Sequence, residues 1–237
     1  VTDKITVEFI NVTHSVPDSA ILAIHTPYGI VMYAVDYKFD EYPQIGETPN
    51  YKRLKELGKK GVTCLILESL YADYDIETPS EQDVKDELYN VLEALDAEGK
   101  TMFSSTFSSH VVRLKTLIEA GLSLGRKVCL IGSSLELHTS ISKKLSKLQL
   151  PREIEIVKRR DDVAKLLSDV SENRGDYFLI CTGHQGESGS VLSKIADGFY
   201  GFTPQEKDII IFSSSVIPTE TNQKSFKILE DKLIDLN

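Results

Sequence analysis

The stretch that decides the fold is Asp176–Gly198, "DYFLICTGHQGESGSVLSKIADG". It opens with an apolar run, passes through glycines and small polar residues from Thr182 to Gly189, and then takes on a helical pattern near Ser190. An apolar run that leads through a Gly-rich loop into a helix is typical of one unit of a parallel α/β sheet.

The same order of apolar run, polar loop and helix recurs through most of the chain after residue 77. The predicted strands read TMFSSTF, KVCLIG, EIEIV, DYFLICTG and DIIIFSSS. The helices between them are predicted to begin near Ser109, His138, Asp161 and Ser190. Regular alternation of this kind predicts a Rossmann-like parallel sheet with helices on both faces.

Residues 1–76 follow a different pattern. The segments ITVEFI, AILAIHTP and GIVMYAVDYK read as antiparallel strands, with a hairpin turn at Pro27–Gly29. A short helix over NYKRLKELGKKG leads into VTCLILES, a continuous apolar run of the kind expected in a fully buried strand. The next helix is predicted to start at an N-cap on Thr78, with Glu81 closing a capping box.

Composition excludes several classes of protein. The chain has 237 residues, 41% of them hydrophobic and 27% charged, as in an ordinary globular protein. A net charge of −9 argues against a protein that coats polyanions, although it permits a local basic groove. No apolar run reaches the roughly 20 residues of a membrane span. Cys64, Cys129 and Cys181 lie in apolar runs, so we expect reduced core cysteines and a cytoplasmic location.

The two ends of the sequence carry an expectation of their own. The chain starts at Val1 without a methionine and ends on the helical pattern DKLIDLN. We therefore expect these residues to be the central piece of a longer protein.

Polar residues gather where the predicted parallel strands end. The segments concerned are SSTFSSH, GSS, TGHQGESGS and SSSVIPTE. Serine, threonine and glycine at the start of a helix can bind anions through hydroxyl and backbone N–H groups. Each loop alone could equally be a helix cap or a tight turn. Four such loops at one edge of a sheet favour a phosphate-rich ligand.

A second set of polar residues ends the strands of the first part. Asp36 ends IVMYAVD, Glu68 ends VTCLILE, and His14 ends FINVTH. An acid at the end of an apolar strand must be solvated, paired or bound to a metal. His14 and Asp36 could share a zinc ion, but two ligands are too few for a complete site. Both interpretations stay open on these residues alone.

Six motifs, taken in order, carry a resemblance to a known family. They are VTHSVPDS, YAVDYKFD, LILESLYA followed by TPSE, TFSSHVVRL, TGHQGESGSVLSKIADG and IFSSSVIPTE. The chain resembles the β-CASP ribonucleases of the metallo-β-lactamase superfamily, above all ribonuclease J and its archaeal relatives. The resemblance covers nearly the whole chain.

The resemblance implies a domain plan and an activity. It implies an α/β protein with part of a metallo-β-lactamase αββα layer over residues 1–76. A Rossmann-like parallel-sheet β-CASP domain would span residues 77–222, and a helix over 223–237 would return to the first domain. The implied activity is zinc-dependent hydrolysis of single-stranded RNA, as a 5′–3′ exonuclease and also as an endonuclease. Two zinc ions and a homodimer are implied for the complete protein.

The resemblance also assigns roles to residues of this chain. His14 and Asp36 match metal ligands, and Asp36 and Glu68 match catalytic positions. The residues that match the RNA-binding surface are Ser108, Arg113, Ser134, Gln185, Glu187 and Ser214. The H-x-H-x-D-H motif and the later histidine motifs of the family do not occur in these residues. We therefore expect an incomplete zinc site and no activity from this polypeptide alone.

Alternatives remain at the level of function and of single residues. A non-catalytic β-CASP module that binds RNA or a protein partner is the main alternative. A nucleotide- or phosphosugar-binding enzyme fits poorly, since the chain has no G-x-G-x-x-G motif or P-loop. His184 could stack on an RNA base or serve the loop structurally. The basic stretch KKLSKLQLPREIEIVKRRDD (143–162) could be a solvated face or an RNA contact.

Overall fold

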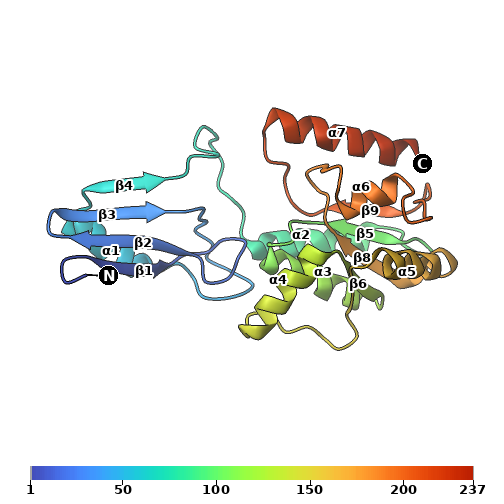
Figure 1. Cartoon of the computed structure of the whole chain (residues 1–237), viewed down its shortest axis with the longest axis horizontal. Coiled ribbons are helices and arrows are strands. Elements are labelled where there is room, and N and C mark those ends of the chain that lie inside the picture. Colours follow the sequence, from blue (N-terminus) through green and yellow to red (C-terminus); the bar gives the residue numbers. More distant parts are fainter. Residues whose placement is uncertain (1, 237) are drawn as a thin grey trace. The chain divides into compact units, whose positions relative to one another are not determined.

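The computed structural model describes residues 2–236, which form two compact units (Figure 1). The first unit ends at Leu88 and the second begins at Tyr89, so the division falls inside helix α2 (Glu81–Ala94). The domain boundary expected at residue 76 stays a prediction. Val1 and Asn237, at the outer ends of the predicted segments, lie outside the described residues.

The first unit is built on a four-stranded sheet in the order β1-β2-β3-β4. Its strands are β1 (Thr6–Asn11), β2 (Ala20–Thr26), β3 (Gly29–Ala34) and β4 (Cys64–Leu67). β1 and β3 both run antiparallel to β2, whereas β4 runs parallel to β3. The carboxyl ends of β1, β3 and β4 therefore meet at one edge of the sheet.

One face of this sheet forms the core of the first unit. Ile10 lies opposite Ile21, and Ala23 lies opposite Met32. All four side chains are buried against helix α1 (Tyr51–Lys60), whose Leu57 is fully enclosed. The predicted antiparallel strands and short helix are therefore present.

Strand β4 corrects one prediction from the sequence. All four of its residues are exposed, and Leu65 keeps 52% of its surface in contact with solvent. β4 is the edge strand of its sheet, so β3 is its only strand neighbour among the described residues. The fully buried strand predicted for VTCLILES is wrong here, and Cys64 is exposed rather than part of the core.

The second unit contains a five-stranded sheet in the order β7-β6-β8-β5-β9, and every pair in it is parallel. Its strands are β5 (Met102–Ser105), β6 (Lys127–Ile131), β7 (Glu155–Val157), β8 (Tyr177–Cys181) and β9 (Ile209–Phe212). The alternation of strands and helices predicted this arrangement. The α/β fold class is confirmed.

Helices cover both faces of the parallel sheet. They are α3 (Val111–Ser123), α4 (Ser133–Lys144), α5 (Arg160–Glu172), the 3-10 turn η1 (Arg174–Asp176), α6 (Val191–Ala196) and α7 (Glu220–Asp235). Side chains of α5, α6 and α7 pack with Phe103, Leu179 and other residues of one face. On the other face, α3 approaches so closely that a side chain at Gly121 would collide with Val128 and Phe178.

Two helices begin at positions other than those predicted. α4 begins at Ser133 and not near His138, because Gly132, with φ of 130°, turns the chain directly after β6. α2 begins after Ser80 rather than after Thr78. The Ser80 Oγ accepts a bond from the Asp83 N–H at 2.9 Å, and the Asp83 carboxylate accepts one from the Ser80 N–H at 2.8 Å. This reciprocal pair is a capping box.

The last helix belongs to the second unit by its packing. Leu229 and Leu233 of α7 are buried in the same core as Phe103 and Leu192. Lys232 of α7 pairs with Asp197 just after α6, at 2.6 Å. None of the helices within residues 2–236 has the length and apolar character needed to cross a membrane.

Candidate functional site

The parallel sheet has a topological switch point between β5 and β8. These strands are neighbours, but the chain leaves β5 toward β6 on one side and leaves β8 toward β9 on the other. Successive right-handed crossovers in opposite directions place their helices on opposite faces. The loops after β5 and β8 therefore lead to opposite faces of the sheet from its carboxyl edge, where open α/β sheets bind ligands.

The loops after β5 and β9 are fastened to each other. The Ser105 carbonyl accepts hydrogen bonds from the backbone N–H of Ser213 at 3.1 Å and from its hydroxyl at 3.2 Å. The hydroxyls of Thr106 and Ser214 lie 3.2 Å apart. These bonds place Ser214, a predicted RNA-binding residue, at the edge of the sheet, half exposed.

The side chain of Gln185 joins the loop after β8 to the loop after β9, and we call its two hydrogen bonds the Gln185 clamp. Its side-chain amide donates to the Ser215 carbonyl at 3.1 Å and accepts from the Ile217 N–H at 2.9 Å. Only 4% of Gln185 is exposed. Gln185 was predicted as an RNA contact, but its amide is committed to the backbone of the neighbouring loop. In the structure, Gln185 sets how the loops after β8 and β9 lie against each other.

His184 is buried beside this clamp, with 1% of its surface exposed. Its ring meets Phe107 edge-on, with the centroids 3.9 Å apart. Neither ring nitrogen has a hydrogen-bond partner within residues 2–236. Burial lowers the pKa of His184, against the opposing effect of the Glu187 carboxylate. The structure therefore favours the structural alternative over stacking on an RNA base.

Gly186 allows the same loop to touch helix α7. Its φ is 76°, in the left-handed region that favours glycine. A Cβ at this position would lie 2.2–2.3 Å from backbone atoms of Ser225 and Phe226. The TGHQGE segment therefore has its shape set by a buried ring, an amide clamp and a backbone contact.

The remaining predicted RNA-binding residues differ in exposure. Ser134 and Glu187 are exposed, Ser108 is half buried, and Arg113 is buried within α3. His110 caps α3 by accepting a bond from the Arg113 N–H at 3.1 Å. The N-termini of α3 and α4 open at this edge beside Ser108 and Ser134, and such helix ends favour anions.

A second group of predicted site residues lies in the first unit. His14, Asp36 and Glu68 follow β1, β3 and β4, whose carboxyl ends share one edge. An antiparallel bridge joins Thr13 to Lys38, and the Lys38 N–H donates to the Thr13 carbonyl at 2.8 Å. The structure therefore brings together the segments that carry His14 and Asp36.

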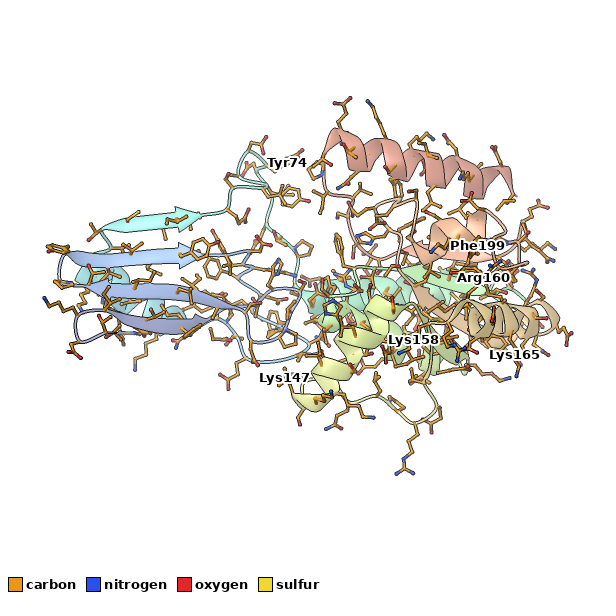
Figure 2. The ribbon with its side chains drawn as sticks, in the orientation of Figure 1. Tyr74, Lys147, Lys158, Arg160, Lys165 and Phe199 are labelled. Carbon is orange, nitrogen blue, oxygen red and sulfur yellow. The ribbon has the colours of Figure 1, made fainter. Side chains whose placement is uncertain are left out.

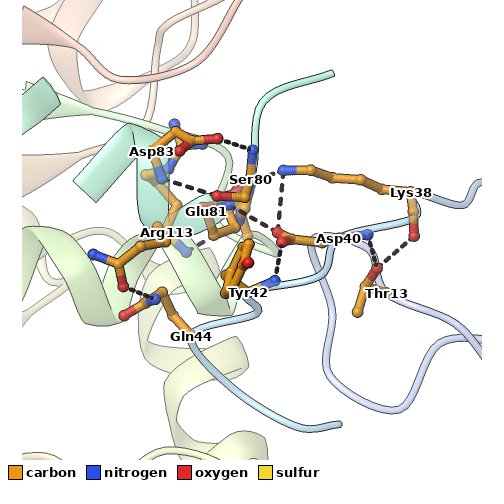
Figure 3. Close-up of polar contacts among 11 residues, drawn as sticks. Thr13, Lys38, Asp40, Tyr42, Gln44, Ser80, Glu81, Asp83 and Arg113 are labelled. Carbon is orange, nitrogen blue, oxygen red and sulfur yellow. Dashed lines mark hydrogen bonds and ion pairs between the residues drawn. The ribbon is translucent and has the colours of Figure 1, made fainter. Parts of the chain in front are cut away.

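The segment that follows Asp36 is held by Asp40, which the sequence interpretation missed (Figure 3). Asp40 is 3% exposed and accepts bonds from the backbone N–H groups of Tyr42 and Glu81, each at 2.8 Å. The Lys38 ammonium lies 3.4 Å from the Asp40 carboxylate and 3.3 Å from the Glu81 carboxylate. An acid two residues after a lysine at a strand end, in YKFD, was the available signal for such a buried pair.

A family model described as Ribonuclease J, beta-CASP domain, matches residues 98–232. The chain belongs to the ribonuclease J β-CASP family. The matched residues contain all five strands of the parallel sheet and the loops at its carboxyl edge.

Relatives from the ribonuclease J family match a longer part of the chain. Ribonuclease J of Pyrococcus abyssi is 42% identical over 236 residues, which cover 98% of this chain and 51% of that protein. Ribonuclease J of Methanocaldococcus jannaschii is 36% identical and covered to 52%. The chain spans about half the length of the curated relatives it matches.

A solved structure shows the same fold. It is the crystal structure of a protein of unknown function from Enterococcus faecalis, which matches 98% of this chain and 51% of its own with a TM-score of 0.57. At 15% identity, this likeness concerns the fold alone.

The donors of this ribonuclease J family chain do not make up a metal centre by themselves. Within residues 2–236, no three histidine, cysteine, aspartate or glutamate side chains gather closely enough to hold a metal ion. The His14 Nδ1 lies 3.1 Å from the Ser15 hydroxyl, and the Glu68 carboxylate accepts a bond from the Leu70 N–H at 2.6 Å. Zinc sites need three or four protein ligands, so the residues present do not fit zinc on their own.

Proposed function

We propose that this chain is part of a ribonuclease that hydrolyses phosphodiester bonds in single-stranded RNA. The observation that supports this most directly is the match of residues 98–232 to the β-CASP domain of ribonuclease J. The interlocked loops at the carboxyl edge of the parallel sheet agree with it, since they present hydroxyls and helix N-termini to one side. A phosphate backbone is the matching ligand.

The side chains at this edge that reach solvent, fully or in part, are proposed as the direct RNA contacts. They are the exposed Ser134 and Glu187 and the half-buried Ser108 and Ser214. Serine hydroxyls suit phosphate oxygens, and Glu187 suits a donor on a sugar or base. Gln185 and Arg113 are buried, so their proposed role is to hold the loops in place. We propose 5′–3′ exonuclease activity as the main mode and endonuclease activity as a second one.

The hydrolytic centre is proposed at the edge formed by β1, β3 and β4. We propose a metallo-β-lactamase type of centre with two zinc ions, toward which His14 and Asp36 act as ligands, with Asp36 and Glu68 as the catalytic positions. The Thr13–Lys38 bridge and the bond from the Asp40 N–H to the Thr13 hydroxyl, at 2.9 Å, hold the two ligand segments together. Because these residues do not hold a metal alone, we propose that the isolated chain is inactive.

A cytoplasmic location is proposed from the cysteines. Cys64, Cys129 and Cys181 are free, which suits a reducing compartment. Burial raises the pKa of Cys129 and Cys181 to about 12, so both remain thiols at neutral pH.

A homodimer is also proposed, on the family resemblance, and size-exclusion chromatography with light scattering tests it.

The activity test uses the intact gene product that contains these residues. It is incubated with zinc or manganese and a single-stranded RNA that carries a 5′-monophosphate. We expect cleavage, and we expect Asp36→Ala to abolish it. Asp75→Ala, which changes an exposed loop acid of the same unit, is the matched control and should cleave normally. Intact RNA with the unmodified protein, or full activity in Asp36→Ala, contradicts the proposal.

A non-catalytic RNA-binding module is the second candidate. The lack of a three-ligand cluster within residues 2–236 favours it for the isolated chain. It predicts RNA binding with no cleavage by the intact gene product at any metal concentration. Binding and cleavage are therefore measured on the same samples.

A further inference from the structure

An exposed aromatic side chain lies between two cations on the α5–α6 side of the second unit. Phe199 follows α6 and keeps 47% of its surface exposed. The Arg160 guanidinium lies 4.6 Å from the centre of its ring, and the Lys194 ammonium lies 5.9 Å from it. Figure 2 shows Phe199 and Arg160 side by side. We call Arg160, Lys194, Phe199 and Tyr200 the Phe199 patch.

The fourth member extends the aromatic surface. The rings of Phe199 and Tyr200 meet edge-on with centroids 5.2 Å apart. Tyr200 is half buried, and burial raises the pKa of its hydroxyl, while the charge of Arg160 acts in the opposite direction. Arg160 and Tyr200 both contact the Phe199 ring, so the patch is one continuous surface.

Within residues 2–236, the two cations of the patch, Arg160 and Lys194, contact the Phe199 ring and form no ion pair with a carboxylate. Neighbouring cations are paired: Lys158 lies 3.0 Å from Glu136, and Lys232 lies 2.6 Å from Asp197. Asp161 is exposed beside Arg160 and offsets part of its charge. In a chain of net charge −9, two unpaired cations on an exposed ring need an explanation.

The position of the patch relates it to the candidate site. Arg160 is the first residue of α5, which starts just after the carboxyl end of β7. β7 belongs to the same parallel sheet as β5 and β8, so this end of α5 lies at the edge that carries the polar loops. α6 follows the TGHQGE loop directly and leads to Phe199. The Arg160 end of the patch therefore lies at the carboxyl edge of the parallel sheet.

We propose that the Phe199 patch is a second contact for single-stranded RNA. A base stacks on the free part of the Phe199 ring or on the outer face of the Arg160 guanidinium, and phosphates contact Arg160 and Lys194. Aromatic rings with adjacent cations bind single strands in this manner, whereas a duplex keeps its bases inside. The inference rests on the proposed function for its choice of RNA, and it adds a site outside the loops.

The experiment measures binding of the whole chain to a fluorescein-labelled, unstructured single-stranded RNA of about 12 nucleotides, a length within the range of such surfaces. Phe199→Leu should weaken binding about tenfold, because one stacked base is lost. Arg160→Gln should reduce the slope of log K against log salt by about 0.7, the value for one phosphate contact on a single strand. Circular dichroism checks that each variant is folded.

Matched controls come from the other unit. Tyr28→Leu removes a ring that is 93% exposed, and Lys52→Gln removes an exposed cation of α1. Both should leave the affinity and the salt slope unchanged. In addition, RNA that contains 5-bromouridine is cross-linked to the unmodified chain, and the cross-linked peptide should contain Phe199 or Tyr200.

The outcomes separate this inference from the proposed function. RNA binding that is unchanged in Phe199→Leu and Arg160→Gln, with cross-links in residues 182–190 or 213–219 instead, overturns the Phe199 patch and leaves the proposed function intact. No RNA binding by the unmodified chain overturns the inference, while cleavage by the intact gene product still decides the function. Equal binding of polyglutamate shows a general anion surface and also overturns it.

Discussion

Gln185 and His184 are neighbours in one loop, and both side chains are buried. The Gln185 side chain bonds to the Ser215 carbonyl and the Ile217 N–H of the next loop, and the His184 ring packs against Phe107. The exposed Glu187 follows them, with its carboxylate 3.2 Å from the Gln185 N–H. The loop therefore presents a surface whose shape depends on residues that do not themselves reach solvent.

Replacing Gln185 with alanine should loosen this edge. The change leaves the Ser215 carbonyl and the Ile217 N–H without their partner, and buried unsatisfied groups of this kind cost about 1–3 kcal/mol. Urea unfolding should show this loss in Gln185→Ala. Gln205→Ala, at an exposed position, is the control and should unfold as the unmodified chain does. Equal midpoints for the two variants would show that the clamp contributes nothing.

His184 should make stability depend on pH in the mildly acidic range. Its pKa in the folded state is lowered below the ordinary value of 6.5 by burial, so the unfolded state binds a proton first as the pH falls. Lowering the pH through 6.5 should therefore destabilise the chain, until the folded-state pKa is passed. His184→Gln should remove this part of the pH dependence of the unfolding free energy, and His138→Gln should retain it. Equal slopes in both variants would contradict the assignment.

Two elements show how neighbours decide what local pattern leaves open. The apolar run of β4 is compatible with burial, but β4 lies at a sheet edge, and burial depends on what covers a strand. Thr78 and Ser80 could each cap α2 by local chemistry. Asp40, distant in sequence, accepts the Glu81 N–H and favours the later start.

Substitution in β4 should separate exposure from core packing. Ile66 is exposed in β4, whereas Ile30 is buried in β3. Ile66→Lys should change the unfolding free energy by no more than about 0.5 kcal/mol and should lower self-association, because a charge blocks pairing at a strand edge. Ile30→Lys should unfold the first unit. Light scattering and urea titration measure both effects, and unfolding of Ile66→Lys would show that β4 is covered.

Much of the element order was predictable, because strand and helix patterns repeat with different periods. The position of the candidate site was predictable too, since polar loops after parallel strands must share an edge. The inward direction of the Gln185 and His184 side chains was not predictable. Both are polar residues in a Gly-rich loop, and only the contacts of Ser215, Ile217 and Phe107 turn them inward.

At the scale of the whole molecule, the two units have separate cores. Ile10, Met32 and Leu57 belong to one, and Phe103 and Leu229 belong to the other. The second unit has a sheet covered by helices on both faces, and the sheet of the first unit has an apolar edge strand that is exposed. The second unit is therefore the better candidate for independent folding.

Expression of residues 77–237 alone should give a folded protein. This piece keeps α2 whole and contains the entire parallel sheet, so it should show a single cooperative urea transition by circular dichroism. Residues 1–76 alone should be less stable and more prone to aggregate, because Leu65 and Ile66 remain exposed. A broad, non-cooperative transition for residues 77–237 would contradict this expectation.

The close approach of Gly186 to α7 has an evolutionary consequence. Any side chain at position 186 would meet the backbone at Ser225 and Phe226, where no rotamer change can make room. A glycine-to-alanine variant should therefore survive only with a compensating shift of the helix, and its first phenotype should be heat sensitivity. The loop and the terminal helix are bound to diverge together, although thirty-nine positions of sequence separate Gly186 from Ser225.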